Sequence, residues 1–139
     1  MKVYVGIDPG KTGAVAVLHG PEDIIFFDTG DSLSLDYVEV FVCIEKAQAW
    51  PDQGVVSMFN YGVEYGKMLG MLKTLNIPFA EIHPNLWKKE FSLFHQPKER
   101  SIAVAKQLFP SISDHLTRKK DHGRAEALLI AEYARRRNM

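Results

Sequence analysis

Five side chains that can bind a divalent cation or take part in acid–base chemistry lie where predicted strands or helices begin or end. The first ends a strand-like segment and precedes a glycine turn, and the second ends a continuous apolar run. The other three lie at the start of the last predicted helix, where positions 122 and 126 share one face. The candidate catalytic and metal-binding residues are Asp8, Glu45, Asp121, His122 and Glu126.

These side chains can meet if the strands that end at Asp8 and Glu45 are neighbours and the last helix packs across their ends. A carboxylate at the C-terminal edge of an α/β sheet lies where open folds of this class bind ligands. Three or four such groups repel one another unless a divalent cation neutralises them, and they suit Mg²⁺ or Mn²⁺. Two ions about 4 Å apart can activate a water molecule and stabilise the leaving oxygen in phosphodiester cleavage. A metal-dependent nuclease is the function that this set fits best.

Each acidic residue also has a structural explanation when it is taken alone. Asp8 can be a turn residue, Glu45 can be a charge that solvates a strand end, and Asp121 can cap a helix. The sequence signals no Ser-His-Asp arrangement and no Walker lysine, and Cys43 is expected to be buried. Their joint placement therefore favours the nuclease.

The apolar pattern predicts an α/β fold in which a mixed sheet is flanked by helices. Three strands joined by short turns at the start of the chain are typical of an antiparallel meander. No linker or repeat divides the sequence, so we expect a single domain over residues 1–139. We expect strands at 2–8, 14–18, 24–28, 38–45 and 78–83, helices at 57–75, 97–108 and 121–137, and optionally a short helix at 34–39.

Three glycines, Gly62, Gly66 and Gly70, recur every four residues and line one stripe of the helix expected at 57–75. Each glycine costs about 1 kcal/mol relative to alanine in a helix interior. Close approach of another backbone would offset this cost. That backbone belongs either to the same chain or to a second subunit.

The charge of the chain is zero overall but unevenly distributed. Residues 1–85 hold 5 Lys and Arg against 11 Asp and Glu, whereas residues 86–139 hold 12 against 6. This asymmetry hints at nucleic-acid contact through the basic part, and solvated helix faces explain it equally well. One cysteine excludes a disulfide framework, and no apolar run approaches the roughly 20 residues that span a bilayer. We expect a soluble, cytoplasmic protein.

Basic and aromatic side chains are the candidates for DNA contact, because cations bind phosphates and exposed rings stack on unpaired bases. Core packing is the alternative for the aromatic residues, and Trp87 is expected to lie in the core. The Arg135–Arg137 end is expected to be a solvated helix terminus. The candidates are Lys88, Lys89, Arg100, Lys106, Arg118, Lys119, Lys120, Arg124, Trp50, Phe59 and Tyr61.

Four blocks of the sequence resemble RuvC-type Holliday-junction resolvases, especially the small versions encoded by bacteriophages. They cover nearly the whole chain in the right order. The resemblance implies a ribonuclease H-like fold, a metal-dependent homodimer with Mg²⁺ or Mn²⁺, and paired nicks in a four-way DNA junction. The blocks are GIDPGKTGAVAVL at 6–18, VCIEK at 42–46, SMFNYGVEYGKMLGML at 57–72 and DHGRAEALLIAEYARR at 121–136.

By this resemblance, Asp8 matches the family's first-strand aspartate and Glu45 its fourth-strand glutamate. Glu126 occupies the acidic position of the last helix, where many relatives carry aspartate. Family members often have another ligand three residues earlier, and that position is Gly123 here. Asp121 or His122 must then stand in for the missing ligand.

A dimer follows from the implied task, because two symmetric cuts need two sites and one small domain offers one. The helix beginning near Ser57 is the candidate interface.

A sugar-kinase or actin-like ATPase is an alternative, because such proteins open with a similar strand and phosphate loop. These ATPases need two lobes that clamp a nucleotide, and a chain of this length has room for only one. A non-catalytic DNA-binding module and a nuclease for other branched DNA or RNA–DNA hybrids stay open. A phage-encoded protein would act in the host cytoplasm.

Overall fold

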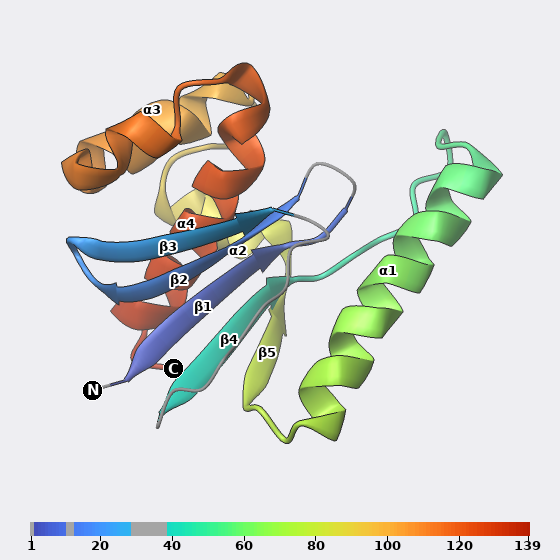
Figure 1. Ribbon diagram of the computed structural model, residues 1–139. Helices are drawn as coiled ribbons and strands as arrows, with labels where there is room; N and C mark the ends of the chain where they lie inside the picture. The colour runs from blue at the N-terminus through green and yellow to red at the C-terminus, as the bar shows by residue number, and fades with distance from the viewer. Residues whose placement is uncertain (1, 11–12, 29–38) are drawn as a thin grey trace.

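The computed structural model describes residues 2–10, 13–28 and 39–139, and it contains the predicted mixed sheet (Figure 1). The strands follow the order β3-β2-β1-β4-β5. The short helix considered at 34–39 falls almost wholly outside the described residues. The strands are β1 (Val3–Asp8), β2 (Ala14–Gly20), β3 (Asp23–Asp28), β4 (Val40–Glu45) and β5 (Phe79–Ile82).

The pairing of the strands brings the C-terminal ends of β1, β3, β4 and β5 to the same edge of the sheet. β1, β2 and β3 form the expected antiparallel meander. β1 pairs in parallel with β4, and β4 pairs in parallel with β5. The C-terminal ends of β1, β4 and β5 therefore lie side by side.

Helices cover both faces of the sheet, with α2, α3 and α4 on one face and α1 on the other (Figure 1). The seven-residue helix α2 is absent from the sequence-based expectation. Two short 3₁₀ helices, η1 and η2, lie between α3 and α4. The bounds are α1 (Val55–Thr74), α2 (Pro84–Glu90), α3 (Glu99–Leu108), η1 (Pro110–His115), η2 (Lys119–Asp121) and α4 (His122–Arg136).

Alternation along β1 divides the core into two halves, because successive side chains of a strand point to opposite faces. Val3, Val5 and Ile7 pack on the α1 side with Leu72. Tyr4 packs on the other side, in the larger cluster that α4 fills. Ten residues of α4 are buried, which makes it the central helix of the fold.

Gly6 permits α4 to lie directly against β1. A Cβ atom at this position would lie 1.9 Å from the carbonyl oxygen of Ala127 and 2.5 Å from the amide nitrogen of Ala131. No side chain fits there, so the backbones of strand and helix touch. This contact fixes the first turns of α4 relative to the end of β1.

α1 is the least buried of the long helices. Leu72 is its one buried residue, while Val55, Val56 and Phe59 near its start are at least 70% exposed. A Cβ added at Gly62, Gly66 or Gly70 would meet nothing within 4 Å among the described residues. The glycine stripe thus has no close neighbour in the described part of this chain. Within that part, no helix is long and apolar enough to span a membrane.

Candidate active site

Asp8 and Glu45 lie side by side because they end adjacent parallel strands. Ile7 pairs with Ile44, so the next residue of each strand is an acid at the same level. Strand alternation places both carboxylates on the face that also carries Gly6 and Cys43, which is the face covered by α4. The sheet alone therefore brings together two of the predicted residues.

Glu126 of α4 completes a group of three carboxylates with Asp8 and Glu45. It directly precedes Ala127, whose backbone lies against Gly6 two residues before Asp8. Burial raises the pKa of Asp8 well above its usual range, and the charges of Glu126 and Glu45 and a hydrogen bond with Glu126 raise it further. Mutual repulsion of this kind indicates a site that favours a cation.

Glu45 has a hydrogen-bond partner among the described residues, since Trp87 of α2 donates from Nε1 to Oε2 at 2.8 Å. Burial raises the pKa of Glu45, the Trp87 hydrogen bond lowers it, and the charge of Glu126 raises it. Lys88 is close enough to lower the pKa of both Asp8 and Glu45. Neither Trp87 nor Lys88 was predicted to interact with the carboxylates.

His122 lies beside Glu126 on the first turn of α4, as their spacing predicted. Its Nδ1 atom is buried, has no hydrogen-bond partner among the described residues, and lies 3.8 Å from Oε2 of Glu126. A buried imidazole nitrogen without a partner beside Glu126, which belongs to the group of three carboxylates, adds a donor of a kind that fits a divalent cation. Among the described residues, however, no three His, Cys, Asp or Glu side chains are arranged to hold an ion as they stand. An ion would have to draw the carboxylates together.

Asp121, in contrast, is occupied by Arg118. Its Oδ2 accepts a hydrogen bond from the backbone N–H of Arg118 at 2.8 Å. Its Oδ1 accepts one from Nη2 of the same arginine, also at 2.8 Å. Burial raises the pKa of Asp121, but its hydrogen bonds with Arg118 outweigh burial and lower it. The carboxylate closes the turn before α4, and both its oxygens are used there.

Arg124 is also held within the fold. Its guanidinium forms a bidentate pair with Asp28 of β3, with both nitrogen–oxygen distances at 2.8 Å, and a third bond reaches the carbonyl of His115. Of the predicted phosphate contacts, Arg118 and Arg124 thus have intramolecular carboxylate partners.

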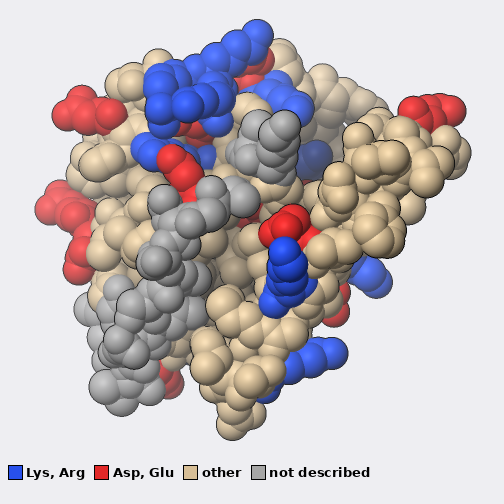
Figure 2. All heavy atoms as spheres, turned by 45° about the vertical axis from the view of Figure 1, so that its right-hand side comes forward, with Lys and Arg blue, Asp and Glu red and all other residues tan. Residues whose placement is uncertain are grey.

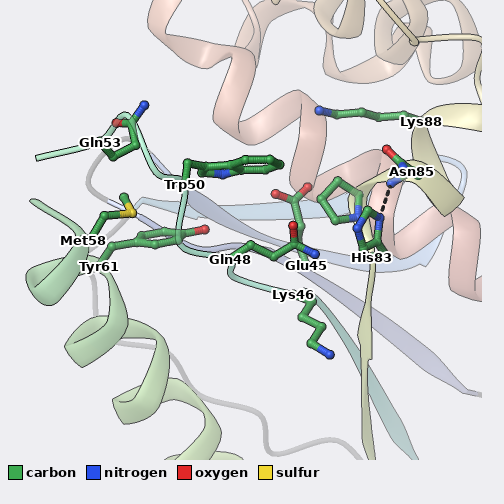
Figure 3. A pocket seen from close by; sticks show the side chains of 11 residues that line it. Glu45, Lys46, Gln48, Trp50, Gln53, Met58, Tyr61, His83, Asn85 and Lys88 are labelled. Atoms are coloured by element: carbon green, nitrogen blue, oxygen red, sulfur yellow. Dashed lines mark hydrogen bonds between the residues drawn. The ribbon is translucent and has the colours of Figure 1, made fainter. Parts of the chain in front are cut away.

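A hollow of about 420 Å³ opens beside Glu45 at the end of the sheet (Figure 3). Trp50 and Tyr61 line one side of it, and His83 and Asn85 line the other. Trp50 is 57% exposed, so a flat ring is available to a ligand. Sequence analysis missed His83 and Asn85, although they follow a strand that ends at the same edge as β1 and β4.

Tyr61 brings α1 close to the carboxylates. Its ring lies 3.2 Å from where a Cβ of Gly10 would be, and Gly10 has a φ of +118° in the turn after Asp8. Burial, then the charges of Glu45 and Asp8, raise the pKa of Tyr61 to about 12. Phe59, two residues earlier, is 70% exposed and does not line the hollow.

A second, shallower hollow of about 490 Å³ lies at the start of α4. It is lined by Lys98, Glu99, Lys119, Lys120 and His122, and Lys119 pairs with Glu99 at 3.2 Å. Lys and Arg side chains gather along the top of this face in Figure 2. Because His122 lines this hollow and also adjoins Glu126, the lysine side chains of the hollow lie near the group of three carboxylates.

Known proteins that resemble this chain in sequence or in structure include a Holliday junction resolvase and RuvC. No protein-family model matches the chain. A Holliday junction resolvase of Chlamydomonas reinhardtii, the chloroplastic protein MOC1, is 32% identical over 98 residues, which are 70% of this chain and 11% of that protein. A structure of Thermus thermophilus RuvC in complex with a Holliday junction substrate superposes with a TM-score of 0.63 at 16% identity, covering 99% of this chain and 96% of that one. The chain has the RuvC fold.

A second structure of Thermus thermophilus RuvC gives a TM-score of 0.58 at 17% identity, over 98% of this chain and 96% of that one. The resemblance to RuvC-type resolvases and the ribonuclease H-like fold expected from the sequence are thereby confirmed. The chain spans only about a tenth of the length of its curated relative.

Proposed function

We propose that this RuvC-like chain is a metal-dependent, structure-selective endodeoxyribonuclease that resolves four-way DNA junctions by paired symmetric nicks. The observation that carries the proposal is the meeting of Asp8, Glu45 and Glu126 at one edge of the sheet. Sequence similarity to a Holliday junction resolvase supports junction DNA as the substrate.

Asp8, Glu45 and Glu126 would hold Mg²⁺ or Mn²⁺, and the Nδ1 atom of His122 is the fourth candidate ligand. We favour His122 over Asp121 because both oxygens of Asp121 are bonded to Arg118. When bound, a pair of such ions supplies the Lewis acidity that activates a water molecule and stabilises a leaving alkoxide. Within this chain, Lys88 is placed to offset negative charge near Asp8 and Glu45.

The DNA strands would pass over the edge of the sheet between the two hollows. Lysine side chains would contact phosphates, which supply affinity without sequence information. Trp50 and Tyr61 would stack on unpaired bases at the branch point. The lysines that we assign to phosphates are Lys88, Lys89, Lys119 and Lys120.

The enzyme would act as a homodimer, since one chain offers one carboxylate group and a junction needs two cuts. The exposed apolar residues at the start of α1, together with its open glycine stripe, form the surface that a second copy would cover. Because Tyr61 lies on the same helix, this contact would also support the wall of the hollow beside Glu45.

The test incubates the purified chain with a synthetic four-way junction, a flapped duplex and a linear duplex, each with Mg²⁺, Mn²⁺ or chelator. We expect symmetric nicks in the junction only, lost with chelator and in Asp8→Asn and Glu45→Gln. Glu81→Gln, which changes a carboxylate on β5 bonded to Tyr65, is the matched control and should cut normally.

Each other outcome favours a named alternative. Cutting of the flapped duplex would indicate a nuclease with other branched substrates. Junction binding without cutting under any metal would indicate a non-catalytic module. Cutting that survives chelation would contradict the mechanism, and ATP binding in the absence of DNA would favour the ATPase class.

A further inference from the structure

One hydrogen bond joins the short helix α2 to the carboxylate at the end of β4. Nε1 of Trp87 donates to Oε2 of Glu45 at 2.8 Å, and Trp87 is only 1% exposed. An indole N–H can only donate, and a buried one needs an acceptor. This acceptor is one of the three carboxylates of the candidate site.

The donor is fixed in place by the fold. The ring of Trp87 packs in the larger core together with Phe91 and Leu93. α2 begins with Pro84, one residue after β5 ends, and the Nδ1 atom of the intervening His83 accepts a hydrogen bond from the backbone N–H of Asn85. β5 pairs in parallel with β4, with Ile82 opposite Glu45, so α2 begins beside the end of β4 that carries Glu45.

Glu45 is the member of the group that most needs such a partner. Its side chain is longer than that of Asp8 and loses more rotamer freedom when it is held in one position. It borders an open hollow, where the negative charge of Glu126 would favour its turning toward water. The hydrogen bond from Trp87 holds Glu45 against this turn toward water.

We propose that Trp87 is a positioning residue that holds one oxygen of Glu45 through its indole N–H, so that the other oxygen is presented to a divalent cation. The inference rests on the proposed function, because it takes Glu45 to be a metal ligand. Hydrogen bonds from neighbouring side chains commonly orient ligating carboxylates in this way.

Trp87→Phe tests the proposal, since it keeps an aromatic ring in the core and removes the donor. Mn²⁺ binding to the full chain without DNA is measured by electron paramagnetic resonance. We expect Mn²⁺ affinity to fall about 10- to 100-fold, the usual effect of removing a partner of a metal ligand. With the junction, kcat should fall at subsaturating Mn²⁺ while KM for DNA and junction binding in chelator stay unchanged.

Two further variants separate positioning from packing. Replacing Trp87 with 3-benzothienylalanine, which keeps the bicyclic shape and has sulfur in place of N–H, should weaken Mn²⁺ binding as Trp87→Phe does. Tyr65→Phe removes a side-chain donor from Glu81, a carboxylate outside the group, and should leave Mn²⁺ affinity unchanged. In a Glu45→Gln background, Trp87→Phe should cause no further loss, because the two residues act through one ligand.

The failures of the two proposals differ. If Glu45→Gln weakens Mn²⁺ binding but both Trp87 variants bind it as the wild type does, Trp87 is only a core residue and this inference is wrong. If Glu45→Gln itself leaves Mn²⁺ binding and junction cutting unchanged, both the proposed function and the role of Trp87 are wrong.

Discussion

The backbones of Gly6 and Ala127 are in direct contact, and this contact places Glu126 near Asp8. A Cβ atom on Gly6 would lie 1.9 Å from the carbonyl oxygen of Ala127, closer than any side chain can approach. The strand that ends in Asp8 and the helix that carries Glu126 therefore pack backbone against backbone, with no side chain between them at this point. The position of the acids is a consequence of this packing.

Gly6→Ala should consequently destabilise the protein far more than Gly66→Ala does. The methyl group meets backbone atoms that cannot rotate away, so we expect a loss of about 3 kcal/mol in the free energy of unfolding. Urea denaturation measures this loss. Gly66→Ala, which meets open space in the chain, is the control, and equal stability of the two variants would refute the packing argument.

α1 should carry the subunit interface. In sedimentation velocity, we expect the wild type to be dimeric and Gly66→Leu or Phe59→Ser to shift it toward monomer, because a bulky or polar side chain disturbs a close apolar contact. The variants should keep the far-UV circular dichroism of the wild type. A wild type that stays monomeric at all concentrations would disprove this interface.

The carboxylate group should lower the stability of the metal-free protein. The pKa of Asp8 is raised in the folded state, so its charged form opposes folding. This penalty sets in as the pH rises above the ordinary aspartate pKa and is full above the raised, folded-state pKa. At pH 7 without metal, Asp8→Asn should be more stable than the wild type by about 0.5 to 2 kcal/mol, a common gain at functional sites. Thermal unfolding with and without Mg²⁺ tests this, and equal melting temperatures of both proteins in chelator would contradict it.

Asp121 should affect stability without affecting catalysis. Its pKa is lowered in the folded state, so its contribution is present above the unfolded pKa and is lost as the pH falls through the folded value. Asp121→Asn should cost about 1 to 3 kcal/mol at pH 7 and little below the lowered, folded-state pKa. Junction cutting by the folded variant should match the wild type, whereas His122→Ala should weaken Mn²⁺ binding. The reverse pattern would make Asp121 the ligand.

Trp50 should contribute to recognition of the branch point. Loss of one stacked base costs about 1 to 3 kcal/mol, so Trp50→Ala should weaken junction binding about tenfold and duplex binding much less. Phe94→Ala, which removes another exposed aromatic ring outside the hollow, serves as the control. Fluorescence anisotropy in chelator gives both affinities, and equal losses in the two variants would exclude stacking by Trp50.

The strands and the meeting of Asp8, Glu45 and Glu126 follow from local rules. Alternation gives the face of each strand residue, and parallel strands end at one edge, so two acids that end neighbouring strands must be close. The fold was predictable for the same reason. The pattern allowed the strands that end at Asp8 and Glu45 to be neighbours, and the structure shows that they pair.

The roles of Trp87, Arg118 and Asp121 could not be derived in this way. Trp87 was expected in the core, and it is buried there, but its N–H direction depends on α2, which is too short for a periodicity signal. Arg118 and Asp121 look like part of a basic run and a free acid. They pair because a 3₁₀ turn folds them onto each other, a tertiary detail without a sequence pattern.

The proposed nuclease requires Asp8, Glu45 and Glu126 to bind a divalent cation together. Anomalous diffraction from crystals grown with Mn²⁺ tests it most directly. We predict a manganese peak within bonding distance of oxygens from all three side chains, absent from crystals of Glu126→Gln. A peak held by other residues, or the three carboxylates unmoved and without manganese at saturating concentration, would show that these side chains do not form the metal site.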